Sequence, residues 1–283
     1  MLKDMKNTTR KKIILEKRIE LDTSYKAEPV FIADNISFAY GQRIVLNNIS
    51  FYLNKGSLCG LLGPNGSGKS TLFRCCMQFL KASQGKMSIW NKNLSSISIK
   101  ELSKIIAYVP QGESTTFDFR VRDVVEMGRT PYRSLFGISQ KDKEAVHKAM
   151  HTLGVEELAD KYYKNLSGGQ KQMVLIARAL AQETPLIFLD EPTAALDFHN
   201  QIMVWNALKN LTRHGTTIMV CCHDPNHILW FCDHVLCLKD GKLIVSGHPN
   251  KTLTNHTLKH LFGNSCVISF MDNIPIAHPR FES

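Results

Sequence analysis

The sequence predicts an α/β fold, and three observations support this prediction. Short, mostly apolar runs at 58–62, 186–189 and 217–222 have the length and composition of strands buried in a sheet. Each run is followed by a glycine-rich or polar segment and then by a stretch with helical spacing. A block of helical periodicity from 121 to about 158 lies between two predicted strands, which indicates an inserted helical subdomain.

The bulk composition is that of an ordinary soluble globular protein. The chain has 283 residues, of which 43% are hydrophobic and 21% charged, enough for one or two domains. No run approaches the ~18–20 apolar residues that a membrane span needs. The only apolar kernel near the N-terminus, 13–15, stands between charged residues and is too short for a signal peptide.

The formal net charge of +10 is spread along the chain rather than gathered in one basic tract. Nucleic acid, an anionic membrane surface and a merely solvated surface all remain open as explanations. The eight cysteines include no C-x-x-C pair, so neither a zinc site nor a thioredoxin-type motif is indicated. We expect reduced thiols in a cytosolic protein.

The N-terminal part divides into two stretches that differ in composition and hydrophobic pattern. Residues 1–28 are polar and basic, and we interpret them as an extension without assigned chemistry. Short β-type runs then predict a small antiparallel β region, and Gly41 and Gly56 punctuate it. Tyr40 precedes the first of these turns, where its ring could stack on a purine or simply pack in a hairpin. The four predicted runs are 30–32, 36–38, 44–46 and 49–51.

The most informative stretch follows the apolar run 58–62. Its G-x-x-x-x-G-K-[ST] spacing predicts a loop whose backbone N–H groups and following helix N-terminus surround phosphate. Lys69 can reach the terminal phosphates and the Ser70 hydroxyl can bind magnesium. The alternative is a glycine-rich turn that only starts a helix over 72–80. We predict nucleoside triphosphate binding by Gly63, Pro64, Asn65, Gly66, Ser67, Gly68, Lys69, Ser70 and Thr71.

A second helix start, at 166–170, carries a serine, two glycines and a glutamine. Ser167 and Gln170 have the spacing of a capping box, which by itself is only structural. Glycines between them leave the helix N-terminus uncovered by side chains. The functional interpretation is therefore a second anion site made of N–H groups, the helix dipole and the serine hydroxyl.

Polar residues follow two further predicted strands, at the edge where ligands of open α/β sheets bind. Asp190 can hold magnesium through water, and Glu191 is placed to polarise an attacking water. A solvated turn is the alternative for this acid pair. His223 ends the strand 217–222, where it is either structural or hydrogen-bonded to a terminal phosphate. Towards the C-terminus, 266–270 and 274–276 predict a small hairpin.

Taken together, these motifs resemble an ATP-binding-cassette (ABC) transporter ATPase, over roughly 30–262. No catalytic motif of that family is missing. The matching residues, in family order, are Tyr40 for the adenine-stacking aromatic, 63–71 for Walker A, Gln111 for the Q-loop, 166–170 for the signature, 186–190 for Walker B with Glu191 after it, 195–197 for the D-loop and His223 for the switch.

The resemblance implies that two ATPase subunits pair head to tail, with the signature helix of one covering ATP on the Walker motifs of the other. Gln111 would link the nucleotide to the helical subdomain, which docks on a membrane permease. The resemblance assigns catalysis to Lys69, Gln111, Glu191 and His223, ATP contacts to Tyr40, the loop 63–71, Ser167, Gly168, Gly169, Gln170 and Asp197, and magnesium to Ser70, Gln111 and, through water, Asp190.

The segment 121–132, the run 224–227 and the short hairpin look similar to importers for iron–siderophore, haem and cobalamin. This implies a homodimer with permease subunits and an extracytoplasmic solute-binding protein, at the cytoplasmic face of the inner membrane and without nucleic acid. Molybdate or tungstate importers, or a soluble ABC ATPase acting on nucleic acid or a scaffold, remain alternatives. The expected domains are a basic extension 1–28, an ABC ATPase domain 29–265 with a helical subdomain about 113–165, and a hairpin tail 266–283.

Overall fold

The structure, a computed structural model, describes residues 28–111, 118–133 and 137–280. Of the predicted parts, nearly all of the basic extension 1–28 lies outside the described residues. So do 113–117 and 134–136 of the expected helical subdomain and the last three residues of the tail. No helix in the described ranges is both long enough and apolar enough to cross a membrane.

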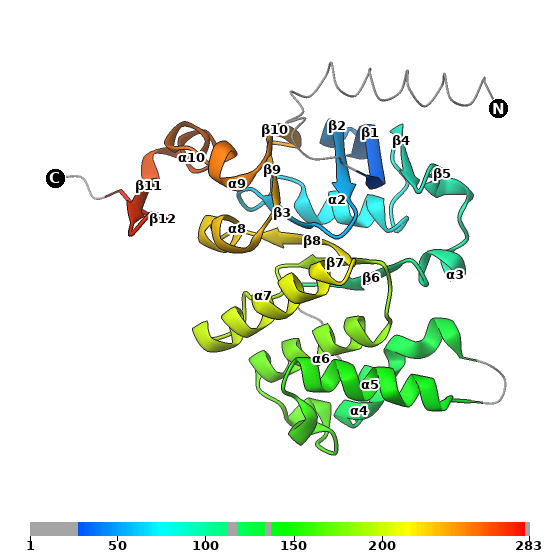
Figure 1. The fold of residues 1–283 in the computed structure, drawn as a ribbon. Helices are drawn as coiled ribbons and strands as arrows, with labels where there is room; N and C mark the ends of the chain where they lie inside the picture. Colours follow the sequence, from blue (N-terminus) through cyan, green and yellow to red (C-terminus); the bar gives the residue numbers. More distant parts are fainter. Residues whose placement is uncertain (1–27, 112–117, 134–136, 281–283) are drawn as a thin grey trace.

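A six-stranded sheet forms the centre of the molecule (Figure 1). Its five neighbouring strands from β9 to β6 run parallel, and only β10 is antiparallel to its neighbour. The carboxyl ends of the parallel strands therefore meet at one edge. In spatial order the strands are β10 (Lys242–Gly247), β9 (His234–Lys239), β3 (Leu58–Leu62), β8 (Thr217–Cys222), β7 (Leu186–Asp190) and β6 (Ile106–Val109).

A second, antiparallel sheet is built from the N-terminal residues. Its strands, in spatial order, are β2 (Arg43–Asn54), β1 (Pro29–Tyr40), β4 (Gln84–Ile89) and β5 (Lys92–Asn93). The prediction of four short runs before residue 52 was wrong in number, because the runs join into the two 12-residue strands β1 and β2. Asn35 and Asn48 adopt left-handed φ of 53° and 55°, and the register shifts between Ala33 and Ile36, as at a β-bulge.

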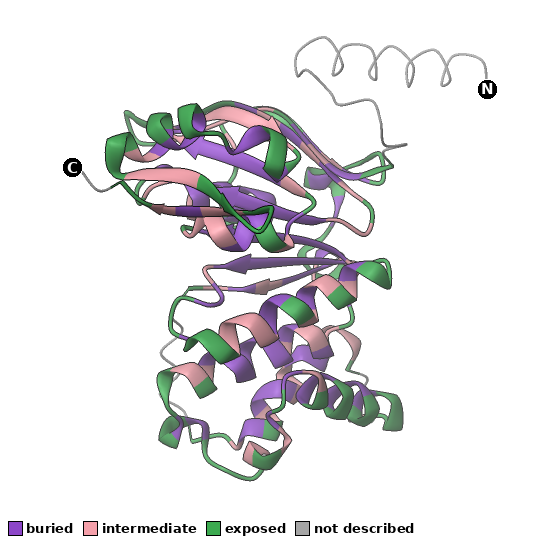
Figure 2. Ribbon diagram, turned by 60° about the vertical axis from the view of Figure 1, so that its left-hand side comes forward, coloured by how far each residue is buried: buried purple, intermediate pink, exposed green. Residues whose placement is uncertain are grey.

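The helix α2 (Lys69–Cys76) lies between these two sheets and shares one core with them. Cys59 and Leu61 of β3 point into this core, whereas Leu58 and Leu62 point to the opposite face. The opposite face carries a second core that includes α6 (Gly168–Ala181), α7 (Phe198–Arg213), α8 (Pro225–Phe231) and α10 (Asn255–Phe262). Figure 2 shows the buried residues along the strands and on the inner sides of these helices. The two cores make the central sheet apolar on both faces, as its strand sequences predict.

Between β6 and β7 the described chain is helical and forms the lower part of Figure 1. It contains α4 (Val121–Glu126), the 3-10 helix η2 (Met127–Tyr132), α5 (Gln140–Thr152) and the 3-10 helices η3 (Glu156–Leu158) and η4 (Tyr163–Asn165), before α6. Pro131 lies inside η2. A short helix α3 (Ile99–Leu102) and the 3-10 helix η1 (Leu94–Ser96) precede β6.

Arg129 fastens this helical part to the corner between α6 and β7. Its buried guanidinium donates to Asp142 Oδ1 at 2.8 Å, to the Ala181 carbonyl at 2.8 Å and to Glu183 Oε2 at 3.0 Å. Hydrogen bonds from Ser139 and Arg129 lower the pKa of Asp142 to about 2. The pairing matters because an unpaired buried charge would strongly destabilise the fold.

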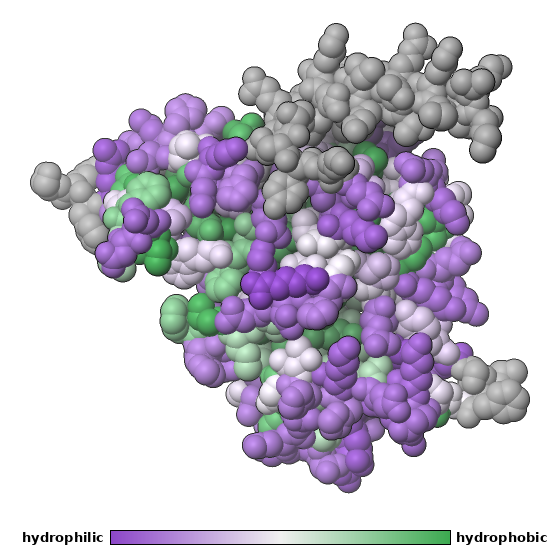
Figure 3. Space-filling view, viewed as in Figure 1, coloured by the Kyte–Doolittle hydropathy of each residue, from purple (hydrophilic) through white to green (hydrophobic). Residues whose placement is uncertain are grey.

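The C-terminal end consists of α9 (Pro249–Thr252), α10, the 3-10 helix η5 (Gly263–Ser265) and a hairpin of β11 (Cys266–Met271) and β12 (Ile274–Pro279). The predicted hairpin is confirmed, and its turn residues Asp272 and Asn273 both have positive φ, as a type I′ turn requires. Hydrophobic side chains gather toward this hairpin on an otherwise largely hydrophilic face (Figure 3), in line with the exposure of Phe270, Met271 and Ile274.

The eight cysteines are all free thiols, and seven of them are buried. Burial raises the pKa of Cys75 to about 11 and that of Cys222 to about 12. These thiols stay protonated near neutral pH and act as small apolar core residues, which agrees with the expectation of reduced cysteines.

Candidate nucleotide-binding site

The glycine-rich loop connects the end of β3 to the first turn of α2. Gly68 caps the helix in a left-handed conformation with φ of 106°, and no side chain accepts a hydrogen bond from its first turn. A Cβ on Gly66 would meet nothing within 4 Å, whereas one on Gly63 would lie 2.1 Å from the Leu238 carbonyl oxygen. The first N–H groups of α2 are therefore free of side-chain caps, and the loop packs closely against β9 on its inner side.

Lys69 is the first residue of α2, and its side chain turns back under the loop. Its Nζ donates to the carbonyl oxygens of Gly63 at 2.8 Å and Pro64 at 3.2 Å, and the residue is only 6% exposed. Among the residues that the structure describes, the buried Ser67 Oγ has no hydrogen-bond partner. A buried ammonium and an unsatisfied hydroxyl in one loop are features that an anionic ligand with oxygen acceptors would complement.

Neighbouring turns hold the loop in place. Gly241, in the turn between β9 and β10, donates its N–H to the Ser67 carbonyl at 3.0 Å and accepts from Asn47 N–H at 2.8 Å. A Cβ on Gly241 would lie 2.2 Å from the Val45 carbonyl oxygen. Sequence reasoning did not place the dipeptide Asp240-Gly241 against the loop 63–71. The dipeptide itself was the available signal, since it marks tight backbone conformations.

Three polar residues meet at the carboxyl ends of β6, β7 and β8. Gln111 Nε2 donates to Glu191 Oε2 at 2.7 Å, and His223 Nδ1 lies 3.7 Å from the same oxygen. Glu191 itself has a left-handed φ of 49°, and its N–H donates to the Cys221 carbonyl at 3.2 Å. Its side chain is 12% exposed, while that of His223 is 58% exposed. The strained backbone of Glu191 and the hydrogen bond from the Gln111 amide thus fix the orientation of the Glu191 carboxylate, and His223 lies beside it.

Asp190 ends β7 and is buried, and its Oδ1 has no hydrogen-bond partner in the described part of the chain. Burial, together with the nearby Asp190 carboxylate, raises the pKa of the Cys221 thiol well above its ordinary value. A buried carboxylate oxygen without a partner is costly unless a cation or water satisfies it. Together with the Ser70 hydroxyl and the Gln111 amide oxygen, Asp190 offers the hard oxygen donors that magnesium prefers, so the residues fit this ion.

The second predicted helix start has the capping box that its sequence spacing predicts. Gln170 N–H donates to Ser167 Oγ at 3.2 Å, and Ser167 N–H donates to Gln170 Oε1 at 3.1 Å. Ser167, Gly168 and Gln170 are exposed, and a Cβ on Gly168 would meet nothing within 4 Å. A Cβ on Gly169 would lie 3.5 Å from the Ala195 carbonyl oxygen and from the Leu196 side chain, so this helix start faces the segment 194–197.

Asp197 closes that segment by capping α7. Its carboxylate accepts from the Asn200 N–H at 2.8 Å and from Asn200 Nδ2 at 2.9 Å, and these hydrogen bonds lower its pKa. Gln201 Nε2 donates to the carbonyl oxygens of Thr193 and Leu196, which holds the loop before α7. Sequence reasoning did not single out Gln201, because nothing local marks a glutamine that reaches back to its own preceding turn.

The structure therefore brings together one part of the predicted site and leaves another part separate. Gln111, Glu191 and His223 converge at one carboxylate. In the described ranges, by contrast, no hydrogen bond or ion pair links 167–170 to the loop 63–71, and α6 and α2 lie on opposite sides of the central sheet (Figure 1). Tyr40 is 47% exposed and contacts Phe38 edge to face at 4.8 Å, so hairpin packing does not bury its ring.

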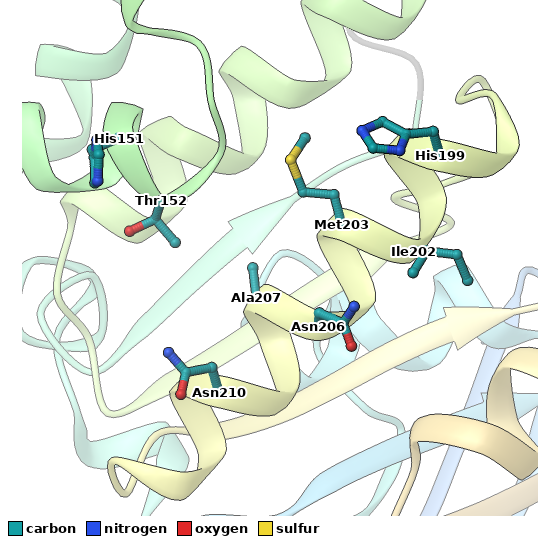
Figure 4. Close-up of a pocket in the computed structure, with 8 residues that line it drawn as sticks. All are labelled: His151, Thr152, His199, Ile202, Met203, Asn206, Ala207 and Asn210. Atoms are coloured by element: carbon teal, nitrogen blue, oxygen red, sulfur yellow. The ribbon is translucent and has the colours of Figure 1, made fainter.

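A pocket of about 620 Å³ lies between α5 and α7, and none of the predicted site residues lines it (Figure 4). Its wall combines the end of α5, at His151 and Thr152, with one side of α7 from His199 to Asn210. The candidate nucleotide site is a loop and strand edge rather than this pocket.

A glycine-rich loop after β3 and a carboxylate after β7 lie at the same edge of the sheet, on either side of β8. This arrangement defines a nucleoside triphosphatase of the α/β class. Comparison with known families specifies the class further. Residues 46–194 match the family model described as ABC transporter. This match spans more than half of the chain, which therefore belongs to the ABC transporter family and is an ABC-type ATPase.

Curated relatives agree with the family match. The chain is 39% identical over 243 residues to a Helicobacter pylori (strain ATCC 700392 / 26695) protein named for iron chelatin transport, covering 84% of this chain and 95% of the relative. It is 34% identical over 237 residues to the ferric enterobactin transport ATP-binding protein FepC of Escherichia coli (strain K12), covering 83% and 88%.

Solved structures confirm the predicted fold. A chain of an inward-facing ABC transporter, described as of metal-chelate type, superposes with a TM-score of 0.77 at 30% identity, covering 90% of this chain and 99% of that one. A dimeric bacterial ABC transporter cassette superposes with a TM-score of 0.68 at 28% identity, covering 77% and 98%. The sequence-based assignment to the ABC ATPase family is thus confirmed.

Proposed function

We propose that this chain is the ATP-hydrolysing subunit of a membrane importer for an iron chelate, and that two copies close head to tail around ATP. The observation that carries this proposal is the separation of two half-sites. One is the loop 63–71 after β3, at the sheet edge that also carries Glu191 after β7, and the other is the exposed start of α6 on the far side of the sheet. Neither half encloses a triphosphate alone, and a two-fold pair would bring each half to its complement.

In this proposal Glu191 is the residue that orients and accepts a proton from the attacking water. Its carboxylate is held by the Gln111 amide at 2.7 Å, and the His223 imidazole lies 3.7 Å away, where it can donate to a phosphate oxygen. Lys69 and the N–H groups at the start of α2 hold the transferred phosphoryl group. Magnesium, held by Ser70, Gln111 and Asp190, would neutralise charge on the phosphates.

The trans role of Ser167, Gly168 and Gly169 is supported by the exposure of Ser167 and Gly168 and by the open space around Gly168. A Cβ at Gly168 would meet nothing within 4 Å in the single chain, so the fold does not require a glycine there. A second molecule that approaches the helix N-terminus closely would require it. The existence of dimeric ABC cassettes among the structural relatives supports the same arrangement for this chain.

The cargo assignment is supported by the relatives, which are named for iron chelatin and ferric enterobactin transport, and by the segment 121–132. On this proposal the partners are a pair of permease subunits and an external solute-binding protein, and the chain sits at the cytoplasmic face of the cell's inner membrane. To test the cargo, the permease and its binding protein would be co-purified with this chain and the metal complex of the binding protein identified. A bound molybdate or tungstate would overturn the iron-chelate assignment.

The catalytic role is tested by Glu191→Gln, with the exposed Glu157→Gln as the matched control. The glutamine keeps the side-chain size and removes the base, so hydrolysis should fall by roughly 10²–10⁴-fold while ATP still binds. The variant should accumulate as an ATP-bound dimer, detected by size-exclusion chromatography with light scattering. Steady-state hydrolysis at the wild-type rate would refute the role of Glu191, and the control should hydrolyse normally.

The composite site is tested by mixing two separately inactive variants, Lys69→Ala and Ser167→Arg. A mixed dimer contains one site with both defects and one site with neither. Because random pairing makes half of the dimers mixed, the mixture should recover roughly a quarter of the wild-type rate if the sites act independently. Absence of any recovery in dimers that demonstrably exchange subunits would contradict head-to-tail pairing.

A further inference from the structure

The C-terminal hairpin of β11 and β12 is bound to the segment that follows His223. Asn226 Nδ2 donates to the Ala277 carbonyl at 3.0 Å, and Asn226 Oδ1 accepts from the Ala277 N–H at 2.7 Å. One side chain thus satisfies both main-chain groups of one residue, 51 positions away in the sequence. The side-chain amide of Asn226 therefore makes the same two hydrogen bonds to Ala277 that the backbone of an adjacent strand would make to β12.

Asn226 lies three residues after His223, and a short network connects the two. Asp224 caps α8 by accepting from the Asn226 N–H at 2.8 Å. The Asp224 carbonyl in turn accepts from Cys222 Sγ at 3.4 Å. The turn that contains His223 is therefore anchored at one end by the buried strand β8 and at the other end by the bond from Asn226 to the hairpin.

Within the described ranges, the side chain of His223 makes only weak contacts with the rest of the protein. The side chain is 58% exposed, and its Nδ1 lies 3.7 Å from Glu191 Oε2, beyond ordinary hydrogen-bond distance. Its place over the carboxylate is consequently set by the backbone of 222–226 rather than by packing of the ring. A shift of about 1 Å at a reacting group can cost roughly 10²-fold in rate, so the anchoring of this turn matters.

Elsewhere the hairpin is fastened independently of the histidine turn. Ala277 is 8% exposed and belongs to the core shared with α8. Trp230 Nε1, one helical turn further along α8, donates to the Pro275 carbonyl at 3.1 Å. The hairpin would thus stay attached without Asn226. The two hydrogen bonds from Asn226 to Ala277 are therefore not needed merely to attach the hairpin.

We propose that the C-terminal hairpin positions His223 for hydrolysis, and that Asn226 is the positioning residue through which it acts. The proposal rests on the catalytic site described above, because it assigns the hairpin a part in that reaction. Asn226 touches neither the phosphate loop nor Glu191 by any recorded hydrogen bond in the described residues, so its effect would pass through the backbone of 223–226.

The test compares Asn226→Ala with Trp230→Phe in the full-length chain. Each variant removes one anchor of the hairpin, but only Asn226 adjoins the histidine turn. Asn226→Ala should lower kcat for ATP hydrolysis roughly tenfold and leave KM for ATP within about twofold. Trp230→Phe should leave kcat unchanged. Asn226→Asp keeps the acceptor for the Ala277 N–H and loses the donor, so its kcat should lie between wild type and alanine.

A double-mutant cycle with His223→Ala tests whether Asn226 affects kcat through His223. If Asn226 acts through His223, the Asn226→Ala change should cause no further loss of kcat in the His223→Ala background. An equal further loss there would overturn the proposal, and so would an unchanged kcat in a folded Asn226→Ala chain or an equal loss in Trp230→Phe. Failure of the catalytic site itself would show differently, as normal hydrolysis by Glu191→Gln.

Discussion

The starts of α2 and α6 are both glycine-rich helix N-termini, yet they are built in opposite ways. At α2 the cap residue Gly68 is left-handed and no side chain accepts from the first turn. At α6 the cap residue Ser167 is extended, and its capping box with Gln170 satisfies the backbone. The first start is enclosed between two sheets and the second is exposed. The comparison shows that the start of α2 is left without a side-chain cap inside the fold, whereas the start of α6 is a capped and exposed surface.

Between these two helix starts, the largest effect is expected at the start of α2. Lys69→Ala removes the ammonium that lies under the loop, so hydrolysis should fall by roughly 10²–10³-fold. Nucleotide affinity should fall as well, which titration of a fluorescent ATP analogue would measure. The exposed Lys81→Ala serves as the charge-matched control and should behave as wild type. Unchanged turnover in Lys69→Ala would remove the phosphate role from this helix start.

The next largest difference is expected between alanine substitutions of Gly68, at the start of α2, and Gly168, at the start of α6. Gly68→Ala should destabilise the fold by about 1–3 kcal/mol, because φ is 106° and the new Cβ would lie 2.9 Å from Leu46 Cδ2 and 3.1 Å from the Val45 carbonyl oxygen. Gly168→Ala should leave thermal unfolding unchanged or slightly improved, since its Cβ meets nothing within 4 Å. It should nevertheless lower ATP hydrolysis in the dimer. Normal hydrolysis by Gly168→Ala would place the start of α6 outside the site.

A smaller effect distinguishes the two serines. Ser167→Ala deletes the cap of α6 and should cost about 1 kcal/mol in the free energy of unfolding. Ser67 Oγ is buried without a hydrogen-bond partner, so Ser67→Ala should cost much less. Urea unfolding of both variants measures the difference. If Ser167→Ala and Ser67→Ala lost the same free energy of unfolding, the hydrogen bond of the capping box would contribute nothing to stability.

The smallest effect concerns Asp197, which caps a third helix, α7, with a charged group. Hydrogen bonds from Asn200 lower its pKa, so its stabilising contribution is present above the ordinary aspartate pKa of about 4 and is lost as pH falls through the lower folded value. Asp197→Asn should therefore flatten the loss of stability below about pH 4. The uncharged cap Ser167 should leave that slope unchanged when replaced by alanine. Thermal unfolding between pH 3 and 7 checks both expectations.

Sequence reasoning predicted features whose physical cause is local. The spacing of Ser167 and Gln170 predicts the capping box, because both partners lie within one helical turn. Asp272 and Asn273 predict the hairpin turn, because both tolerate positive φ. The phosphate loop likewise depends on the backbone freedom of a few adjacent glycines. In each case the residues that interact are neighbours in the chain.

Features that depend on distant residues were not predictable in the same way. The Gln111–Glu191 hydrogen bond joins residues 80 positions apart, and it exists only because β6 and β7 are neighbours in the sheet. Sequence reasoning assigned no structural role to Arg129, which is 3% exposed and paired to Asp142. The bulge at Asn35 also escaped prediction, because two β-type runs separated by polar residues do not reveal that one strand continues through them.

The position of β3 between β8 and β9 also bears on how the protein is made. The strand that leads into the phosphate loop takes both its sheet neighbours from residues beyond 216, and the Leu58 N–H donates to Asp233 across 175 positions. During synthesis the loop therefore leaves the ribosome long before the strands that flank it. A chain cut short before Gly241 lacks the turn that binds Ser67. We therefore expect nucleotide binding to require the chain at least as far as Gly241.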